Sequence, residues 1–193
     1  MRIDGDPVGE LDYSAYHIRM LYHIHKLDPD GDLYRPELVL PRFHKSKECT
    51  DQSAASVREW VKTVTNILLN VDSKAAARAA ATKALKDHKD YELLATAVYG
   101  VERSKPGVIV DRIVEVHADV AHCFFDSRGK YLQSLDGCIM LDILKAFAEQ
   151  GKPALGIHDS IVCKRSDLAF CSEVMRREYV RRFKFEPLVK HAL

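Results

Sequence analysis

The chain has 193 residues, which is enough for one domain with a core, or for one core with a small satellite. Hydrophobic residues make up 47% and charged residues 30%, as in ordinary soluble globular proteins, and the net charge of +1 indicates no class of partner. The five cysteines include no CxxC pair, which argues against a disulfide framework or a structural zinc site and fits a reducing cytosol. Since no apolar run approaches the ~18 residues of a membrane span, we expect a cytoplasmic protein.

The first part of the chain predicts a short buried strand followed by a helix. The strand is expected near residues 9–13, and an amphipathic helix over about residues 14–26. An Asp-Pro-Asp-Gly run at residues 28–31 is a strong turn signal, and a loop is expected from there to about residue 51. This pattern places Asp12 at the end of a strand.

Helices are expected to fill the middle of the chain. Their expected ranges are residues 53–70, 74–89, 106–125 and 130–150. Two short apolar runs then flank Asp159 and Ser160, which predicts a β-hairpin over residues 154–164 with a tight polar turn. A final helix is expected over residues 167–183.

Strands near both ends of the chain, with helices between them, predict an α+β fold. The strand near residues 9–13 is expected to pair beside the hairpin and form a small antiparallel sheet backed by helices. Three segments follow from this layout. Residues 1–50 and 106–193 would contribute to the sheet region, and residues 51–105 would form a helical insertion.

The last helix and the tail are rich in basic side chains. These residues are either a solvated helix face or contacts for phosphate groups. They are Arg176, Arg177, Arg181, Arg182, Lys184 and Lys190.

Asp12 and Asp159 are the candidate catalytic residues. If the strand pairs beside the hairpin, the two carboxylates meet at one edge of the sheet and require a cation between them. Hard oxygen ligands select Mg²⁺ or Mn²⁺, and two such ions support phosphoryl transfer. The alternative for each aspartate is a turn residue or a helix cap.

Two short segments resemble motifs of the family A DNA polymerases and the related phage-type single-subunit RNA polymerases. Residues 11–19 (LDYSAYHIR) are similar to motif A, and residues 156–160 (GIHDS) are similar to motif C, in the family's order. The resemblance implies that Asp12 and Asp159 are the metal ligands. The His-Asp-Ser form is closest to the RNA polymerases, because the DNA enzymes usually have His-Asp-Glu.

A third segment lies between these two. Arg58, Lys62, Asn66 and Asn70 recur every four residues and therefore line one face of a helix. A cation pair one turn apart can clamp a triphosphate, and the segment resembles motif B, the fingers helix that holds the incoming nucleotide. Both asparagines stand where the family has aromatic residues. The alternative for Arg58 and Lys62 is a solvated helix face.

A fourth segment looks like the family segment that precedes motif C. It contains Gln133, Asp136 and Gly137, and a glycine within a helix suggests close approach to template or sheet. The alternative is a loosely packed helix position.

The resemblance also implies roles for four residues around the aspartates. His17 would contact the nucleotide sugar, where the DNA enzymes have a glutamate, or it would be a surface histidine. Arg19 would brace the site, Tyr13 would pack and offer its main-chain carbonyl to a metal, and His158 would support the site or contact primer.

Together these segments imply a template-directed nucleotidyltransferase with a palm sheet and a fingers insertion. The expected partners are a nucleic acid template and primer, nucleoside triphosphates, two Mg²⁺ (or Mn²⁺) and a separately encoded thumb segment, in a bacterial, plasmid or phage setting. In this family the thumb precedes motif A. The chain is therefore expected to be the C-terminal piece of a split gene, a minimal relative or a decayed copy. The alternatives are an inactive nucleic-acid-binding remnant and a two-metal nuclease or other phosphotransferase.

Overall fold

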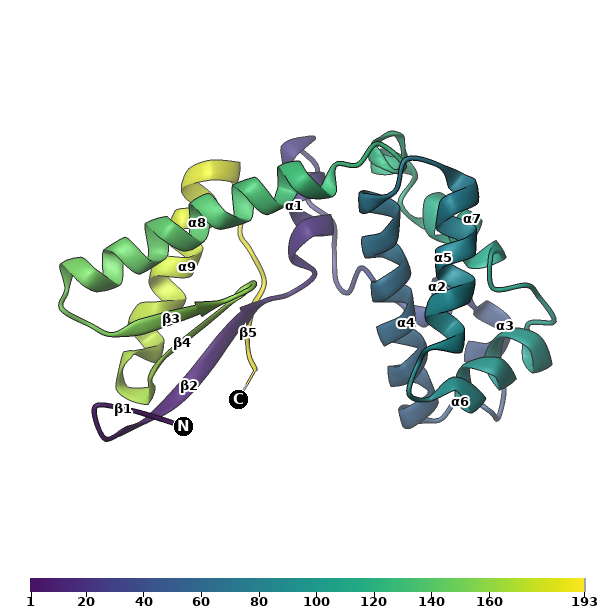
Figure 1. Ribbon diagram of the computed structural model, residues 1–193, viewed down its shortest axis with the longest axis horizontal. Helices are drawn as coiled ribbons and strands as arrows, with labels where there is room; N and C mark the ends of the chain where they lie inside the picture. The colour runs from purple at the N-terminus through teal and green to yellow at the C-terminus, as the bar shows by residue number, and fades with distance from the viewer. Residues whose placement is uncertain (193) are drawn as a thin grey trace. The chain divides into compact units, whose positions relative to one another are not determined.

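The computed structural model describes residues 1–192 and divides the chain into two compact units (Figure 1). The sheet unit comprises Met1–Pro29 and the chain from Tyr131 onward, and the helical unit is Asp30–Lys130. The expected boundaries were different, because residues 30–50 and 106–130 had been assigned to the sheet region. They belong to the helical unit because helices from both segments pack on its longest helix.

The sheet has five strands, all of which pair antiparallel, and the α+β class with a small antiparallel sheet is confirmed. The strands are β1 (Arg2–Ile3), β2 (Asp6–Tyr13), β3 (Ala154–Ile157), β4 (Ser160–Lys164) and β5 (Val189–His191). Their order is β1-β2-β4-β3, and β5 also pairs with β2. The strand from the start of the chain therefore lies beside the hairpin from its last quarter, as the sequence pattern predicted.

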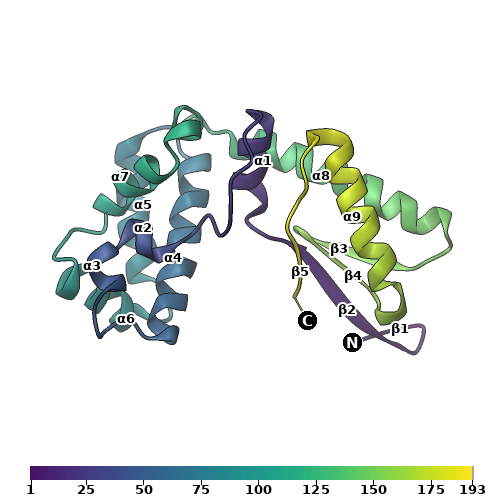
Figure 2. The same ribbon diagram turned by 180° about the vertical axis from the view of Figure 1, so that it is seen from behind.

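The described part of the sheet unit also contains three helices, of which the last two lie against one face of the sheet. They are α1 (Tyr16–Ile24), α8 (Gly129–Glu149) and α9 (Leu168–Phe183), and a short 3-10 turn, η3 (Arg165–Asp167), precedes α9. A Cβ on Gly9 would meet the Leu168 side chain of α9, and a Cβ on Gly156 would collide with the Met140 side chain of α8. The odd-numbered residues of β2 therefore face the helices. The sheet lies in front of α9 in Figure 1 and behind it in Figure 2, so α9 backs this one face.

The helical unit is built around the 20-residue helix α4 (Asp51–Asn70). Thr50 caps its N-terminus by accepting from the Ser53 backbone, while the Ser53 hydroxyl accepts from the Thr50 backbone. The buried Trp60 lies on the inner face of α4 and donates through Nε1 to the Ala81 carbonyl oxygen at 3.3 Å. The other elements are α2 (Pro36–Val39), α3 (Pro41–His44), α5 (Lys74–Lys86), α6 (Tyr91–Ala95), the π-helical turn η1 (Thr96–Val101), α7 (Val108–Val116) and the 3-10 turn η2 (Ala118–Cys123).

Several expected boundaries were wrong. The loop expected up to residue 51 contains α2 and α3, each of which begins at a proline whose missing N–H is tolerated in a first helical turn. The helix expected to reach residue 125 ends at Val116, where His117 leaves the helical conformation. The hairpin turn consists of His158 and Asp159 rather than Asp159 and Ser160, because Ser160 pairs with Ile157 and begins β4. Finally, β5 follows Pro187 and was not expected.

Candidate active site

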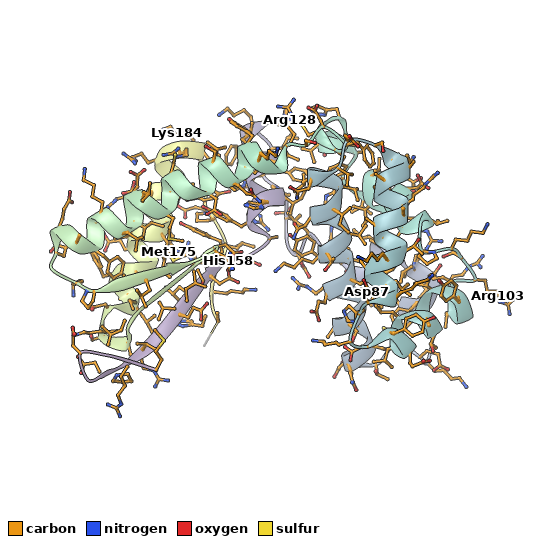
Figure 3. All side chains as sticks on the ribbon, in the orientation of Figure 1. Asp87, Arg103, Arg128, His158, Met175 and Lys184 are labelled. Atoms are coloured by element: carbon orange, nitrogen blue, oxygen red, sulfur yellow. The ribbon has the colours of Figure 1, made fainter. Side chains whose placement is uncertain are left out.

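Strand pairing brings Asp12 and Asp159 to the same end of the sheet. Asp12 is the second-to-last residue of β2 and lies directly opposite Ser160, the first residue of β4. The Tyr13 backbone N–H then donates to the Asp159 carbonyl oxygen at 3.2 Å. Asp159 occupies the second position of the two-residue turn, after His158, which adopts a left-handed φ of 53°. Figure 3 labels the exposed His158 at the tip of the hairpin.

The face of the sheet that points away from α9 carries the polar residues, and we call it the open face. Side chains alternate along a strand, so Glu10 and Asp12 both lie on this face, as does Ser160 opposite Asp12. The Ser160 hydroxyl donates to Glu10 Oε1 at 2.5 Å. The residue directly opposite Glu10 on β4 is Val162, and Ser160 is opposite Asp12. The bond to Ser160 therefore draws the Glu10 carboxylate along the open face toward Asp12.

A stack of tyrosines supports the end of β2 from the other side. The rings of Tyr13 and Tyr16 are parallel to within 10° at a centroid distance of 4.4 Å, and Tyr179 packs against both rings. The Tyr13 hydroxyl donates to the Met175 carbonyl oxygen of α9 at 2.7 Å. Burial raises the pKa of Tyr13 and of Tyr16 well above the ordinary value, so both side chains are neutral. Tyr13 thus packs, as expected, and anchors β2 to α9.

Asp136 and His17 form a second polar contact near this end of the sheet. Asp136 Oδ2 of α8 lies 3.6 Å from His17 Nε2 of α1, and both side chains are partly buried. The carboxylates of Asp136 and Asp159 both add to the raised pKa of Tyr16, after burial and the neighbouring Tyr13. Asp136 thus contacts His17, the candidate sugar contact, from α8.

Gln133 and Gly137 do not take part in that contact. Both are exposed on α8, and a Cβ on Gly137 would meet no atom within 4 Å, so the expected close approach of Gly137 to the sheet was wrong. The close approach is made by Gly156 of β3, which faces α8.

Arg19 is buried and braces the polypeptide behind the site rather than the carboxylates themselves. Its Nη1 donates to the Pro29 carbonyl oxygen at 2.8 Å, which ties α1 to the turn that follows it. Its charge also lowers the pKa of the buried His23, an effect smaller than that of burial.

The helical unit presents the second group of candidate residues. Arg58, Lys62, Asn66 and Asn70 lie on the less buried face of α4, as their spacing predicted. Asn70 Nδ2 donates to the Asn66 carbonyl oxygen at 2.8 Å, and the Asn70 side chain fills the space where a Cβ of Gly129 would lie.

Arg58 already has an anionic partner. Its guanidinium makes two hydrogen bonds to the Asp32 carboxylate, at 2.5 and 2.9 Å, and lies 5.5 Å from the centre of the Tyr34 ring. The bond to Asp32 raises the pKa of Arg58. Lys62, one turn further along α4, is exposed. The two cations on this face therefore differ, one being paired within the unit and the other facing solvent.

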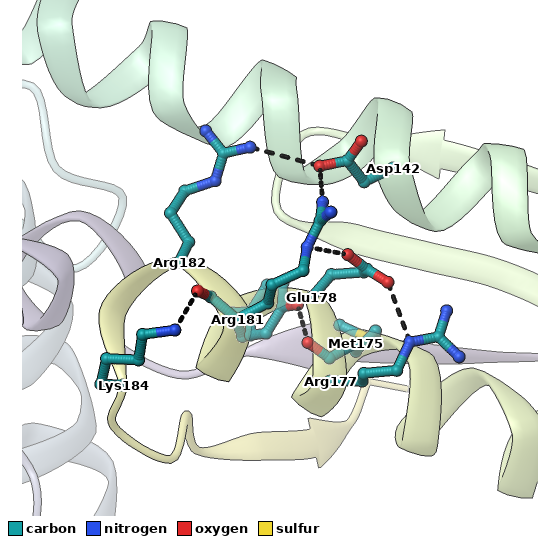
Figure 4. A network of polar contacts seen from close by, with 8 residues as sticks. Asp142, Met175, Arg177, Glu178, Arg181, Arg182 and Lys184 are labelled. Carbon is teal, nitrogen blue, oxygen red and sulfur yellow. Dashed lines mark hydrogen bonds and ion pairs between the residues drawn. The ribbon is translucent and has the colours of Figure 1, made fainter.

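The basic residues of α9 are largely held by acidic side chains of the same unit (Figure 4). Arg181 and Arg182 both contact Asp142 Oδ2 of α8, at 2.6 and 3.2 Å, and Arg177 and Arg181 contact the buried Glu178 at 2.9 Å each. The two contacts with Asp142 join α9 to α8, and those with Glu178 lie within α9. They support the solvated-helix interpretation of the basic tail for these residues.

No protein-family model and no curated protein matches this chain. Across the described residues there is also no helix with the length and apolarity to cross a bilayer.

The oxygen atoms at this end of the sheet suit a hard divalent cation. Asp12 and Asp159 are its candidate ligands, and Glu10 adds a carboxylate on the face of Asp12, of the type that Mg²⁺ and Mn²⁺ prefer. Among the described residues, these three carboxylates do not form a cluster whose ligand atoms all lie within 4.8 Å of one another. The ammonium of Lys190 on β5 lies 3.4 Å from Asp12 Oδ2, which shows that the Asp12 carboxylate faces a position where a positive charge fits. The ligand types at this end of the sheet are those of the cation that the sequence motifs implied.

Sequence reasoning missed Glu10 and Lys190. Glu10 had a usable signal, because a residue two positions before Asp12 in a strand must share its face. Lys190 had none, because a three-residue strand after a proline has no pattern of its own and exists only by pairing with β2.

Proposed function

We propose that this chain is a template-directed nucleotidyltransferase that acts by two-metal phosphoryl transfer. The observation that carries the proposal is the register of β2 against β4, which sets Asp12 opposite Ser160 and beside Asp159. Two carboxylates close together repel each other and favour a cation between them. The sheet unit would be the palm and the helical unit the fingers, in keeping with the order of the four motif-like segments.

The side chains would divide the work as follows. Mg²⁺ ions bound at Asp12 and Asp159 would activate the attacking oxygen and stabilise the leaving one. Lys62 would neutralise the triphosphate and give a proton to the departing pyrophosphate. Arg58 would add its planar fork to the phosphates once it leaves Asp32.

Two further contacts concern the choice of nucleotide. Asn66 and Asn70 would face the base or sugar with amide groups in place of a stacking ring. His17, held by Asp136 at 3.6 Å, would contact the sugar.

Primer extension tests this proposal directly. The full chain is assayed with Mg²⁺ on primed DNA and RNA templates, with ribo- and deoxynucleotides, alongside Asp12→Asn and Asp159→Asn. Each substitution removes a metal-binding charge at nearly constant volume and is expected to reduce extension by about 100-fold or more. Asp87→Asn, at an exposed helix end of the helical unit, is the matched control and should retain activity. Extension at the normal rate by either active-site variant would rule out the assigned chemistry.

A non-catalytic nucleic-acid-binding protein is the second candidate. It is favoured by the ion pairs that already engage Asp12 with Lys190 and Arg58 with Asp32. Such a protein would bind nucleic acid in a salt-sensitive manner without Mg²⁺. Measuring binding with and without Mg²⁺, in the samples used for extension, separates the two candidates.

A further inference from the structure

The strand β5 brings a lysine from the end of the chain to the candidate metal ligand. It pairs antiparallel with β2 and sets Lys190 directly opposite Asp12. Two backbone hydrogen bonds bracket the strand, one from Ser14 N–H to the Leu188 carbonyl oxygen at 2.7 Å and one from Ala192 N–H to the Glu10 carbonyl oxygen at 3.0 Å. The position of Lys190 is therefore fixed by the backbone and not only by its side chain.

The alternation of β5 decides where its side chains lie. Val189 and His191 line a small cavity together with Leu11 and Leu168, on the face that packs on α9. Lys190 lies between them in sequence and consequently belongs to the open face, with Asp12. Its Nζ is 3.4 Å from Asp12 Oδ2.

This ion pair is suited to exchange. The Lys190 side chain is 52% exposed and that of Asp12 is 19% exposed. A half-exposed pair of this kind contributes little to stability, and its nitrogen–oxygen distance is longer than that of a strong charge-assisted hydrogen bond. A divalent cation bound by Asp12 would repel the ammonium, and the long flexible lysine side chain can withdraw into solvent.

We propose that Lys190 is an exchangeable counter-ion of Asp12 that a divalent cation must displace, so that β5 lowers the metal affinity of the site. The inference rests on the proposed function, because it takes Asp12 as a metal ligand. In the metal-free protein Lys190 neutralises Asp12 and limits repulsion with Asp159. When the cation binds, the Lys190 ammonium leaves the Asp12 carboxylate, and the cation neutralises that carboxylate in its place.

Mn²⁺ binding to the full chain, measured by water-proton relaxation, tests the inference without any assay of activity. Lys190→Gln removes the competing charge and is expected to bind Mn²⁺ about two- to fivefold more tightly than the wild type, which is the range a weak exposed ion pair allows. Lys190→Arg keeps the charge and is expected to remain close to the wild type. Lys164→Gln is the control, because Lys164 lies opposite Val8, far along β2 from Asp12, and pairs with Asp4 and Asp6 at 3.2 Å each. It should leave Mn²⁺ affinity unchanged.

A second readout follows the lysine itself. In protein labelled with ¹³C-lysine, the Lys190 Cε signal is identified by its loss in Lys190→Gln. It is expected to shift as Mg²⁺ is added, while the Lys164 signal stays in place. A stationary Lys190 signal at saturating Mg²⁺ would show that the ammonium is not displaced, and would overturn the inference.

Asp12→Asn separates failure of this inference from failure of the proposed function. If Asp12→Asn abolishes Mn²⁺ binding while Lys190→Gln binds no more tightly than the wild type, the metal site stands and the role of Lys190 is overturned. If Asp12→Asn binds Mn²⁺ as tightly as the wild type, Asp12 is not a ligand and both proposals fail.

Discussion

The two units assemble their candidate residues in opposite ways. In the helical unit, Arg58 and Lys62 lie one turn apart on a single helix, so their spacing alone places them on one face. In the sheet unit, Asp12 and Asp159 lie on β2 and in a hairpin turn at the other end of the chain, and only the pairing of β2 with β4 brings them together. The difference teaches that a helix-borne site survives as long as its helix does, whereas the sheet-borne site depends on a register.

The two groups also share one property. In each unit one candidate ionic group faces a residue of opposite charge, namely Lys190 for Asp12 and Asp32 for Arg58. In both cases the partner is partly exposed, so solvent screens the ion pair. The pair of Asp12 with Lys190 is the weaker of the two, because Asp32 holds Arg58 through two hydrogen bonds. Ligand binding would then be an exchange of ion pairs in both units.

The largest effect that we predict concerns stability of the helical unit in acid. His117 is buried, and burial lowers its pKa to about 4 from the ordinary value of 6.5. Between those two pH values the unfolded chain binds a proton that the folded chain does not. The free energy of unfolding is therefore expected to fall as pH drops, by up to about 1.4 kcal/mol per pH unit and about 3 kcal/mol in total. Above pH 6.5 this loss is absent.

Urea unfolding at pH 7 and pH 5 measures this effect, with the fluorescence of the single tryptophan, Trp60, reporting on the helical unit. His117→Gln cannot take up the proton and should flatten the pH dependence, even if it is less stable at pH 7. His44→Gln, at an exposed position of α3, is the control and should keep the wild-type slope. An equal slope in the wild type and His117→Gln would contradict the assignment.

The next effect concerns metal binding at the sheet-borne site, and it is about half as large when both effects are expressed as free energies. Ser160→Ala removes the hydroxyl that holds Glu10 near the Asp12 row at 2.5 Å. Loss of a hydrogen bond that orients a metal-binding carboxylate costs at least about tenfold in metal affinity, and we expect that loss in Mn²⁺ binding. Ser166→Ala, in the exposed turn before α9, should have no effect. Unchanged Mn²⁺ affinity in Ser160→Ala would remove Glu10 from the site.

The sequence patterns predicted the parts of the molecule that depend on local signals. The shared face of the polar residues along α4 and the presence of a hairpin around Asp159 were predicted correctly, because helix and turn preferences act over a few residues. Glu10 was missed although its alternation with Asp12 was visible. Lys190 and the pairing of Arg58 with Asp32 were beyond reach, because both depend on contacts between segments that have no local signature.

The smallest effect that we predict concerns the helix-borne group. Asp32→Asn keeps the shape of the Asp32 side chain but removes the charge that binds Arg58 through two hydrogen bonds. If phosphates must displace Asp32, the variant should bind a nucleoside triphosphate about two- to fivefold more tightly, the range expected for a partly exposed ion pair. Calorimetric titration of the full chain with Mg²⁺-ATP measures the change.

Asp30→Asn is the matched control for that titration, because Asp30 is exposed, lies two residues from Asp32 and changes the net charge by the same amount. Equal gains in both variants would show that only overall charge matters. Weaker binding by Asp32→Asn would show the opposite relation, in which Asp32 holds Arg58 in the orientation that the phosphates need. The outcome therefore decides whether the charge partner on the helix face competes with the ligand, as we propose for Lys190 on the sheet, or prepares the site for it.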